Sequence, residues 1–400
     1  MKTRRFEKPF TQQEGMPDDV IERAVEILKG GRLHRYNTLG DEVSEAALLE
    51  QEYAQWQEAK YCLACTSGGQ AMQIALRSVG LRPGDKILAN AYTLAPVPGA
   101  IHACGGKPVF VEIDQDWHTD ISDLKAKAAA SGAKFMMLSH MRGHIADMDA
   151  ITEICDEHGI TLIEDCAHTM GARWKGVRSG NFAKVACFSA QTYKHVNSGE
   201  GGLLTTDDDE VAARAIIHSG SYMLYQRHGT PPPEEVFQRV RLETPNLSGR
   251  MDNVRAMLIR GQLSGLDRNC ERWNERYQTL EAGLRKCNGI RVPERAQHEA
   301  YVGSSIQFQP ISIEPELIPV LVENCAARGV EIKWFGGAEP VAFTSRYDSW
   351  QYVEEKQDLP NTKSVLARTC DLRVPLTFDL DDCSLIAEII CDEMNNLQSN

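Results

Sequence analysis

Residues 185–206 read VACFSAQTYKHVNSGEGGLLTT. The apolar stretch 185–188 is typical of a buried strand, and 203–206 is typical of a second one. Between them lie a hydroxyl at Ser189, a lysine at position 194 and a cluster of glycines. Glycines let the backbone pass close to a bulky ligand, because no Cβ stands in the way. This stretch therefore predicts two neighbouring strands joined by a ligand-binding turn.

Lys194 is the residue around which we interpret the chain. Between two buried strands its ammonium loses hydration, which lowers the pKa and frees the amine to form a Schiff base with an aldehyde. We therefore predict that Lys194 carries pyridoxal phosphate. The alternative is an ordinary solvated lysine, so the prediction needs partners elsewhere in the chain. A Walker A phosphate loop is excluded, because no Gly-Lys-Ser/Thr follows the glycines.

Length and composition set the broad class. A chain of 400 residues suggests two or three domains, and 42% hydrophobic with 25% charged residues is ordinary for a globular protein. The net charge of −13 argues against nucleic acid or an anionic membrane surface as a partner. No apolar run reaches transmembrane length, and Arg4-Arg5 lack the apolar segment that follows a twin-arginine signal. We expect a cytoplasmic protein.

The twelve cysteines do not predict a disulfide framework or a metal site. Most of them lie in apolar segments, as small buried hydrophobic residues do. Cys62 and Cys65 form one Cys-x-x-Cys pair, but no second pair completes a zinc site. We expect no bound metal.

Strand-like and helix-like segments alternate between residues 61 and 206. The expected strands are 61–65, 86–89, 108–111, 135–138 and 161–164, with helices at 97–104, 124–130 and 148–157 between them. This βαβ repetition predicts a largely parallel sheet with helices on both faces. Such sheets bind ligands at the carboxyl ends of their strands.

Two of these strand ends carry candidate cofactor-binding residues. The strand at 61–65 runs into Thr66-Ser67-Gly68-Gly69 and then an amphipathic helix, which is a geometry that offers backbone N–H groups to a phosphate. Asp165 closes the strand at 161–164, where a carboxylate can keep a pyridine nitrogen protonated. Both features are also compatible with simple helix capping. Asp165 precedes Lys194 by 194 − 165 = 29 residues, about one βαβ unit, so both can reach one crevice.

The remaining segments suggest the domain organisation. Residues 1–30 hold a polar arm and one helix, residues 31–266 form the large domain, and residues 267–400 form a smaller α+β unit. The segment 220–246 is irregular and contains three consecutive prolines. A loop of this length is usually functional or part of an interface.

The ordered set of motifs resembles the DegT/StrS sugar aminotransferases. The motifs are Ser-Gly-Gly-x-Ala (67–71), Pro-Gly-Asp (83–85), His-x-x-Gly with Ala-Asp-Met-Asp (140–149), Glu-Asp-x-Ala (164–167), Phe-Ser-x4-Lys (188–194), Gly-Glu-Gly-Gly (199–202), Arg-Met (250–251) and Arg373-Val374-Pro375-Leu376. The resemblance covers the chain from about Gly40 onward.

The resemblance implies the α/β fold-type I architecture of pyridoxal phosphate enzymes. That fold has a large domain with a mostly parallel sheet flanked by helices, a smaller C-terminal α+β domain, and homodimers with shared active sites. By resemblance, Lys194 forms the Schiff base and Asp165 pairs with the ring nitrogen. Ser189 and the backbone at Gly68-Gly69 hold the phosphate, and His168 lies near the ring hydroxyl.

Three positions depart from the family pattern. Gly69 replaces a threonine that usually offers its hydroxyl to the phosphate. Leu94 stands where an aromatic side chain usually stacks on the ring, and Tyr92 is the candidate to compensate. Ser248 stands where an asparagine usually reaches the neighbouring subunit's phosphate, with Asn246 two residues earlier.

The resemblance further implies a reaction. It is amino transfer from L-glutamate, or from glutamine, to a keto- or aldehydo-sugar in the synthesis of amino sugars for cell-surface glycans, lipopolysaccharide or secondary metabolites. The acceptor is either nucleotide-linked or a free sugar or sugar acid. Arg227 and His228, in the irregular segment, are predicted substrate contacts in the partner's site. A sugar dehydratase and a non-catalytic regulatory protein of the same fold are the alternatives.

Overall fold

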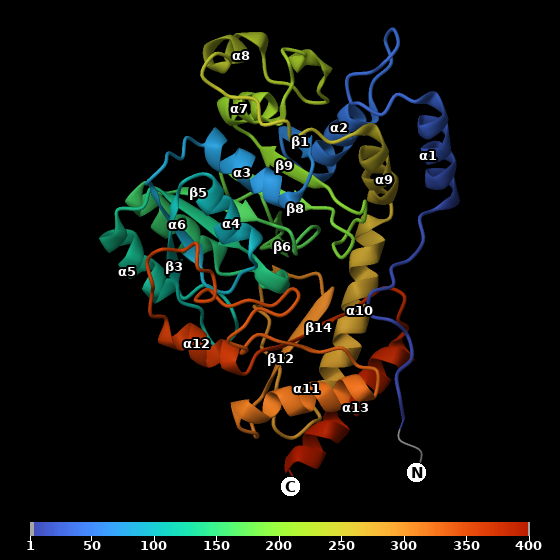
Figure 1. Ribbon diagram of the computed structural model, residues 1–400, viewed down its shortest axis with the longest axis vertical. Helices are drawn as coiled ribbons and strands as arrows, with labels where there is room; N and C mark the ends of the chain where they lie inside the picture. Colours follow the sequence, from blue (N-terminus) through green and yellow to red (C-terminus); the bar gives the residue numbers. More distant parts are fainter. Residues whose placement is uncertain (1–3, 399–400) are drawn as a thin grey trace.

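The computed structural model describes residues 4–398, and its largest element is a seven-stranded sheet (Figure 1). The strand order is β1-β9-β8-β5-β4-β2-β3. The strands are β1 Tyr61–Cys65, β2 Lys86–Asn90, β3 Lys107–Val111, β4 Phe135–Ser139, β5 Thr161–Asp165, β8 Val185–Ser189 and β9 Gly202–Thr206. Six of the seven strands run in the same direction, and β9 is antiparallel to both of its neighbours, β1 and β8. The prediction of a largely parallel sheet is confirmed.

Helices cover both faces of this sheet, and every residue of β1, β4 and β8 is buried. One face packs against α2 Glu45–Gln57, α5 Ile121–Ser131, α6 Met148–His158 and α9 Asn253–Leu263. The other packs against α3 Gly68–Ser78, α4 Pro96–Ala103 and α7 Asp209–Ser219. Alternate side chains of one strand serve the two faces, as in β1, where Cys62 and Ala64 join the first core and Leu63 and Cys65 the second.

The long helix α10 Leu266–Leu284 joins the large sheet to a smaller C-terminal unit, as Figure 1 shows. Its first half packs in the large core through Leu266 and Trp273, and its second half packs in the small core through Tyr277 and Leu280. The change from one core to the other therefore lies inside α10, a few residues beyond the predicted boundary at 266.

The smaller unit is an antiparallel sheet in the order β10-β12-β14-β13, covered by helices. Its strands are β10 Ile290–Arg291, β12 Ser305–Pro310, β13 Lys333–Trp334 and β14 Cys370–Arg373, and its helices are η3 Pro315–Leu317, α11 Ile318–Ala327 and α13 Leu380–Gln398. Within residues 4–398, no helix combines the length and the apolar character needed to cross a membrane.

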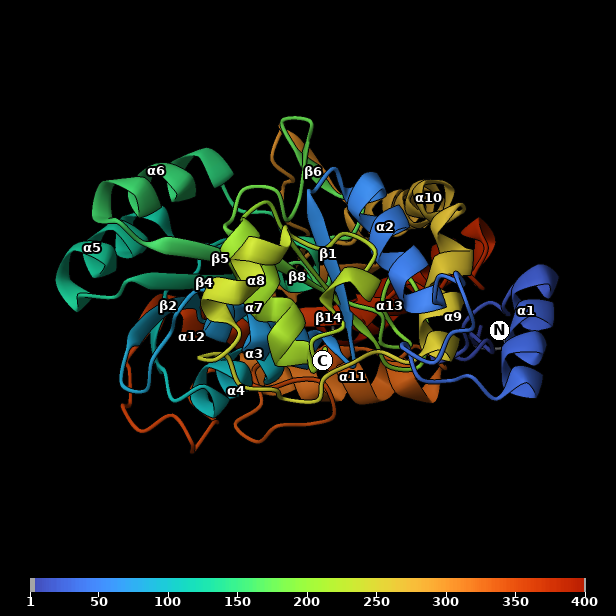
Figure 2. The ribbon, with the colours of Figure 1, turned by 90° about the horizontal axis from the view of Figure 1, so that it is seen from above.

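Three segments cross between the two units. The N-terminal arm packs Phe6 and Phe10 against Phe378 of the small unit, whereas α1 Asp18–Gly30 lies at the edge of the molecule against α9 (Figures 1 and 2). Residues 347–359 and α12 Pro360–Ala367 return to the large unit. The short strand β11 Glu299–Ala300 pairs with the hairpin β6 Arg173–Trp174 and β7 Val177–Arg178.

The segment 220–246 is more regular than its sequence suggests. It contains the short turn η2 Tyr225–Arg227 and the helix α8 Glu234–Val240, which begins directly after the three prolines. The α8 side chains Val236, Phe237 and Val240 are buried in the large core. Proline is favoured before and at the first turn of a helix, so the prolines start this helix rather than prevent one. The prediction of an irregular segment is wrong over these seven residues.

Candidate active site

The predicted site residues gather at one edge of the large sheet. The parallel strands β4, β5 and β8 end there at Ser139, Asp165 and Ser189, and the antiparallel β9 begins there at Gly202. The strand register places Ser139 beside Asp165 and Ser189 beside Gly202. The turn that carries Lys194 connects β8 to β9 and is closed by the hydrogen bond from Ala190 N to Gly201 O, 2.9 Å.

The amine of Lys194 lies 2.7 Å from Nε2 of His168. Burial lowers the pKa of Lys194 to about 7, and the positive charges of Arg142, Arg373 and Lys333 act in the same direction. The carboxylate of Asp165 opposes this shift but does not cancel it. Far more of the Lys194 amine is therefore neutral and nucleophilic near pH 7 than of an ordinary lysine.

His168 is neutral at physiological pH. Its residue is buried, and burial together with the charges of Lys194 and Arg142 lowers the pKa of its imidazole well below the usual range. A neutral imidazole can accept a hydrogen bond from the ammonium of Lys194 or donate one to its amine. His168 therefore orients the Lys194 side chain in both of its protonation states.

Asp165 is a buried carboxylate held by neutral donors. The Ser139 hydroxyl donates to Oδ2 at 2.8 Å, and the Ala167 backbone N–H donates to Oδ1 at 3.1 Å. Ser139 is itself fixed by Asn90, whose Oδ1 accepts from Ser139 N at 2.8 Å and whose Nδ2 donates to Ser139 O at 3.0 Å. No cation among residues 4–398 forms an ion pair with Asp165. Asp165 is thus oriented by hydrogen bonds and has no cationic partner in this part of the chain.

The start of α3 packs directly on the end of β8. The Ser67 side chain caps this helix by accepting from Gln70 N at 3.1 Å. A Cβ on Gly68 would lie 2.9 Å from the Cβ of Ser189, so no larger residue fits there. Gly69 faces open space, with only Ser67 Oγ within 4 Å of an added Cβ. The first N–H groups of α3, which have no partner within the helix, and the Ser189 hydroxyl thus form a cradle that fits a phosphate.

Tyr92 and Leu94 lie beside this edge in a small apolar cluster. The Tyr92 ring packs edge-on against Phe335, with centroids 5.3 Å apart, and the residue is 1% exposed. This burial leaves no ring face on which a cofactor can stack, so the structure does not support Tyr92 as a substitute for the missing aromatic residue. Leu94 is half-buried against the same cluster and keeps an accessible side.

The sequence comparison assigns this arrangement to a family. Residues 16–391 match the family model of DegT/DnrJ/EryC1/StrS aminotransferases. The chain belongs to this aminotransferase family. The resemblance noted from the motifs is therefore confirmed.

The relatives carry names that describe different functions. The chain is 33% identical over 253 residues to dTDP-3-amino-3,4,6-trideoxy-alpha-D-glucose transaminase of Streptomyces venezuelae, a match that spans 62% of each protein, less than two thirds. It is 27% identical over 384 residues to the spore coat polysaccharide biosynthesis protein SpsC of Bacillus subtilis, 93% of each. It is 30% identical over 280 residues to a pleiotropic regulatory protein of Geobacillus stearothermophilus, 70% of each.

Solved structures share the fold. The crystal structure of 3-amino-5-hydroxybenzoic acid synthase superposes with a TM-score of 0.80 at 25% identity, covering 96% of this chain and 99% of that one. The structure of DesV from S. venezuelae gives a TM-score of 0.78 at 26% identity, covering 94% of each chain. The expected fold-type I architecture of the aminotransferases is confirmed.

Asn246 and Ser248, the predicted contacts to the neighbouring subunit's phosphate, lie on an exposed loop. The Asn246 Oδ1 accepts from Ser248 N at 2.9 Å, and Ser248 has a positive φ of 54°. The loop joins the start of α3, because Thr66 N donates to Gly249 O at 3.0 Å. Its side chains are free to meet a second subunit, and a role at the partner's phosphate stays a prediction.

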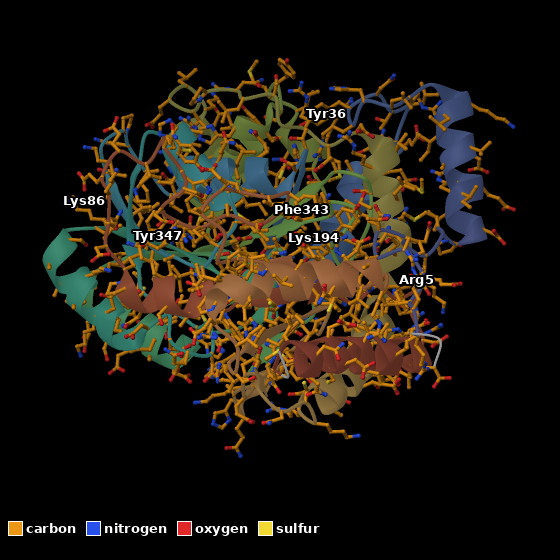
Figure 3. The ribbon with its side chains drawn as sticks, turned by 60° about the horizontal axis from the view of Figure 1, so that its bottom comes forward. Arg5, Tyr36, Lys86, Lys194, Phe343 and Tyr347 are labelled. Atoms are coloured by element: carbon orange, nitrogen blue, oxygen red, sulfur yellow. The ribbon has the colours of Figure 1, made fainter. Side chains whose placement is uncertain are left out.

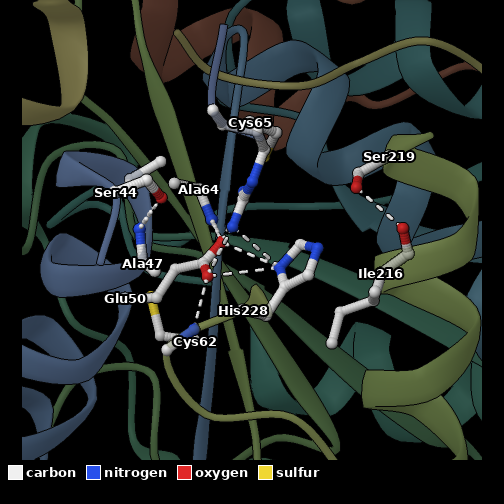
Figure 4. Close-up of polar contacts among 12 residues, drawn as sticks. Ser44, Ala47, Glu50, Cys62, Ala64, Cys65, Ile216, Ser219 and His228 are labelled. Carbon is white, nitrogen blue, oxygen red and sulfur yellow. Dashed lines mark hydrogen bonds and ion pairs between the residues drawn. The ribbon is translucent and has the colours of Figure 1, made fainter. Parts of the chain in front are cut away.

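The structure does not support His228 as a substrate contact. Its side chain is enclosed within its own chain by Arg35, Tyr36 and Glu50. Figure 4 shows the contact between His228 and Glu50. Arg35 and Glu50 form a two-point ion pair, with both N–O distances at 2.8 Å, and both side chains are fully buried. His228 therefore completes a buried network and has no surface to offer. Arg227 donates to Tyr36 O at 3.0 Å and stays a predicted contact.

Three basic residues near Lys194 were not identified from the sequence. They are Arg142, Lys333 and Arg373, whose charges all act on Lys194. Arg142 lies in the quoted His-x-x-Gly motif and Arg373 opens the quoted Arg-Val-Pro motif, so the signal was present without an assigned role. Lys333 belongs to no motif, and only the tertiary fold brings it to this position.

Proposed function

We propose that this protein is a pyridoxal phosphate-dependent aminotransferase that moves an amino group from L-glutamate to an oxo-sugar. The observation that carries the proposal is a lysine with a pKa of about 7 at the same sheet edge as Asp165 and the amino end of α3. The names of relatives support it, since they include sugar transaminases such as UDP-2-acetamido-2-deoxy-3-oxo-D-glucuronate aminotransferase of Pseudomonas aeruginosa.

The residues present fit the cofactor. Its phosphate matches the cradle at the start of α3, where the absence of a Cβ on Gly68 leaves the backbone accessible next to Ser189. Its ring nitrogen matches the carboxylate of Asp165, which has no cationic partner within the described chain. Its aldehyde carbon matches the neutral amine of Lys194. The phosphate, the ring nitrogen and the aldehyde carbon of the cofactor thus each have a complementary side chain or helix end.

The chain's own residues account for the proton movements that transamination needs. When bound, pyridoxal phosphate supplies a carbonyl that combines with amines and a ring that takes up electrons. Asp165 holds a proton at the ring nitrogen. The neutral amine of Lys194 would take the proton from the substrate carbon that bears nitrogen, as a general base. His168 keeps the Lys194 amine aligned through the 2.7 Å contact.

The proposal includes a homodimer with shared active sites. The loop with Asn246 and Ser248 is exposed, and apolar side chains on α1 such as Ile21 and Leu28 are 48% and 57% exposed. An exposed apolar helix face is typical of an interaction surface. We propose that the second subunit covers this face, that Ser248 or Asn246 contributes to its phosphate site, and that the enzyme works in the cytoplasm.

A single-turnover assay tests the proposed function. The protein loaded with pyridoxal phosphate and given L-glutamate without an acceptor should release about one equivalent of 2-oxoglutarate per site and then stop. L-glutamine in place of glutamate tests the alternative donor. No release with either donor, despite bound cofactor, would favour the regulatory alternative that the Geobacillus relative's name suggests.

A further inference from the structure

Three basic side chains face the Lys194 turn from elements that are distant in sequence. Arg142 lies on the turn η1 Met141–Gly143, directly after β4. Lys333 lies on β13 and Arg373 on β14, which are paired strands of the small unit with Lys333 opposite Asp371. All three residues act on the charge of the Lys194 amine. They form a cationic wall on the small-unit side of the site.

Arg142 is buried without the hydrogen bonds that its guanidinium needs. Its side chain is 9% exposed, and its backbone adopts a left-handed conformation with φ of 57°. Nη2 lies 2.9 Å from Oδ2 of Asp371, but the geometry is not that of a hydrogen bond, and neither Nε nor Nη2 has an acceptor among the described residues. A buried guanidinium with free N–H groups is costly unless a ligand satisfies it.

Arg373 and Lys333 contact aromatic rings rather than a carboxylate. The guanidinium carbon of Arg373 lies 3.6 Å from the centroid of the Tyr193 ring, which places this charge next to Lys194 in the turn. The Lys333 amine lies 5.3 Å from the ring of Phe343, which reaches toward the Lys194 turn (Figure 3). Neither residue is found in an ion pair between residues 4 and 398.

The charges of this wall do not balance. The buried carboxylate of Asp371 acts on all three cations, and the exposed Glu331 acts on Lys333. Burial, together with Arg142 and Arg373, lowers the pKa of Lys333 to about 8, and burial with Arg142 also lowers the pKa of Arg373. Like charges crowd each other here, and a bound anion is the species that relieves their repulsion.

We propose that Arg142, Lys333 and Arg373 form a carboxylate-binding subsite beside Lys194, and that the acceptor is an oxo-sugar acid. This inference rests on the proposed function and names the class of its substrate. A transaminase that works in two half-reactions receives the amino donor and the acceptor at one place. The carboxylate of glutamate can pair with these cations in the first half-reaction. A neutral acceptor would leave the half-buried Lys333 and Arg373 without a counter-charge in the second, which disfavours its binding.

A role in holding the phosphate of the cofactor is the main rival. The phosphate cradle is built from the start of α3 and the end of β8, around Gly68 and Ser189. The three cations come instead from η1, β13 and β14, and their nearest neighbours are Asp371, Tyr193 and Phe343. The wall and the cradle thus use different elements of the fold.

The subsite can be tested with unreactive probes on the cofactor-loaded protein. We suggest measuring the Kd of D-glucuronate, D-glucose and glutarate by calorimetry in wild type, Lys333→Met and Arg373→Met. Lys363→Met is the matched control, because Lys363 is an exposed lysine of α12 that pairs with Asp358. We expect glucuronate to bind at least tenfold tighter than glucose, and both acids to lose about tenfold in the two wall variants but not in the control.

The outcomes separate this inference from the proposed function. Equal binding of glucose and glucuronate, or binding of glutarate without glucuronate, overturns the assignment of an acidic acceptor. Lys333→Met and Arg373→Met could instead weaken cofactor binding as much as they weaken acid binding. That result would assign the cations to the phosphate of the cofactor and overturn the carboxylate-binding subsite. Failure of the wild type to bind pyridoxal phosphate contradicts the proposed function, and that is seen in the visible spectrum before any probe is added.

Discussion

The Lys194 amine and the His168 imidazole lie 2.7 Å apart, and the pKa of each is lowered. Since His168 is neutral and Lys194 has a pKa of about 7, the pair carries at most one positive charge at physiological pH. Most lysines keep their proton up to about pH 10.4. The contact therefore joins an amine that is ready to react to the residue that orients it.

The first prediction concerns the pH dependence of cofactor capture. Only the neutral amine attacks an aldehyde, so the rate at which the apoprotein attaches pyridoxal phosphate should rise about tenfold per pH unit below pH 7 and level off above it. Stopped-flow absorbance between pH 5.5 and 9.5 measures this profile. A rate that still rises steeply at pH 9 would mean that Lys194 has an ordinary pKa.

A second prediction concerns the stability of the apoprotein. The pKa of Lys194 is lower in the folded state than in the unfolded chain, so the unfolded chain binds the proton more tightly and folding is penalised. The penalty is complete below about pH 7 and disappears as the pH rises toward about 10.4. Lys194→Met should therefore stabilise the apoprotein by about 2 kcal/mol at pH 7, with a smaller gain at pH 9.5. Urea unfolding at both pH values measures the difference, and a gain that does not depend on pH would point to packing instead.

The sequence predicts the site residues whose positions follow from local pattern, and it misses those that tertiary packing brings to the site. Asp165, Ser189 and Lys194 follow the ends of apolar strands, and the carboxyl ends of parallel strands share one edge of a sheet, so local pattern was sufficient for them. Arg142 and Lys333 come from a short turn and a two-residue strand, whose positions depend on the packing of the small unit. His228 read as a loop residue, and only the fold shows that it pairs with Glu50.

The secondary structure was likewise predicted well where local sequence pattern determines it and missed where tertiary packing does. The strands of the large sheet were predicted to within a residue or two, because their apolar runs are bounded by glycine and polar residues. Helix α7 was missed after the strand at 203–206, although Asp208 caps it by accepting from Glu210 N and Val211 N. Helix α12 was also missed, because its eight residues carry a weak apolar face. Short elements depend on tertiary packing for their stability.

The third prediction compares two adjacent glycines. A Cβ on Gly68 would lie 2.9 Å from the Cβ of Ser189, so Gly68→Ala should displace the start of α3 from β8 and weaken pyridoxal phosphate binding about tenfold or more. Gly69 faces open space, so Gly69→Ala should leave the affinity within about twofold and slightly stabilise the helix. Fluorescence titration of both apoproteins with the cofactor makes the comparison. If the two variants weakened cofactor binding equally, the phosphate would not bind at the start of α3.

The fourth prediction concerns Asp165. In Asp165→Asn the amide cannot hold a proton at the ring nitrogen, so the single-turnover rate should fall about 10²-fold or more while the cofactor stays bound. Ser139→Ala, which removes the 2.8 Å hydrogen bond to Oδ2 but keeps the charge, is the matched control and should cost far less. The single-turnover rate of 2-oxoglutarate release from L-glutamate measures this fall, and a wild-type rate in Asp165→Asn would assign the role to another residue.

The fifth prediction concerns the buried network around Glu50. Burial alone would raise the pKa of Glu50, but Arg35 and His228 outweigh it and lower the pKa well below the usual range. Arg35→Met leaves this carboxylate buried without its partner and should cost about 3–5 kcal/mol of unfolding free energy. Arg32→Met, which breaks the exposed pair with Glu42, should cost about 1 kcal/mol or less.

A pH titration adds an independent check on this network. A carboxyl with a lowered folded-state pKa stabilises the fold above its unfolded pKa of about 4.3, and this contribution is lost as the pH falls further. Below that pH, the unfolding free energy of the wild type should therefore fall relative to that of the double variant Arg35→Met/Glu50→Leu. A difference that stays constant down to pH 3 would show that Glu50 is not charged in the folded protein.

The central claim is that Lys194 carries the cofactor, and the most direct measurement is the position of the covalent bond. The protein is incubated with pyridoxal phosphate, reduced with borohydride, digested and sequenced by mass spectrometry, alongside Lys194→Ala and Lys333→Met. We predict a visible absorption band that borohydride removes, a phosphopyridoxyl group on Lys194 in wild type and in Lys333→Met, and no specific label in Lys194→Ala. A label on Lys333, or a wild-type protein with neither band nor label, would contradict the account.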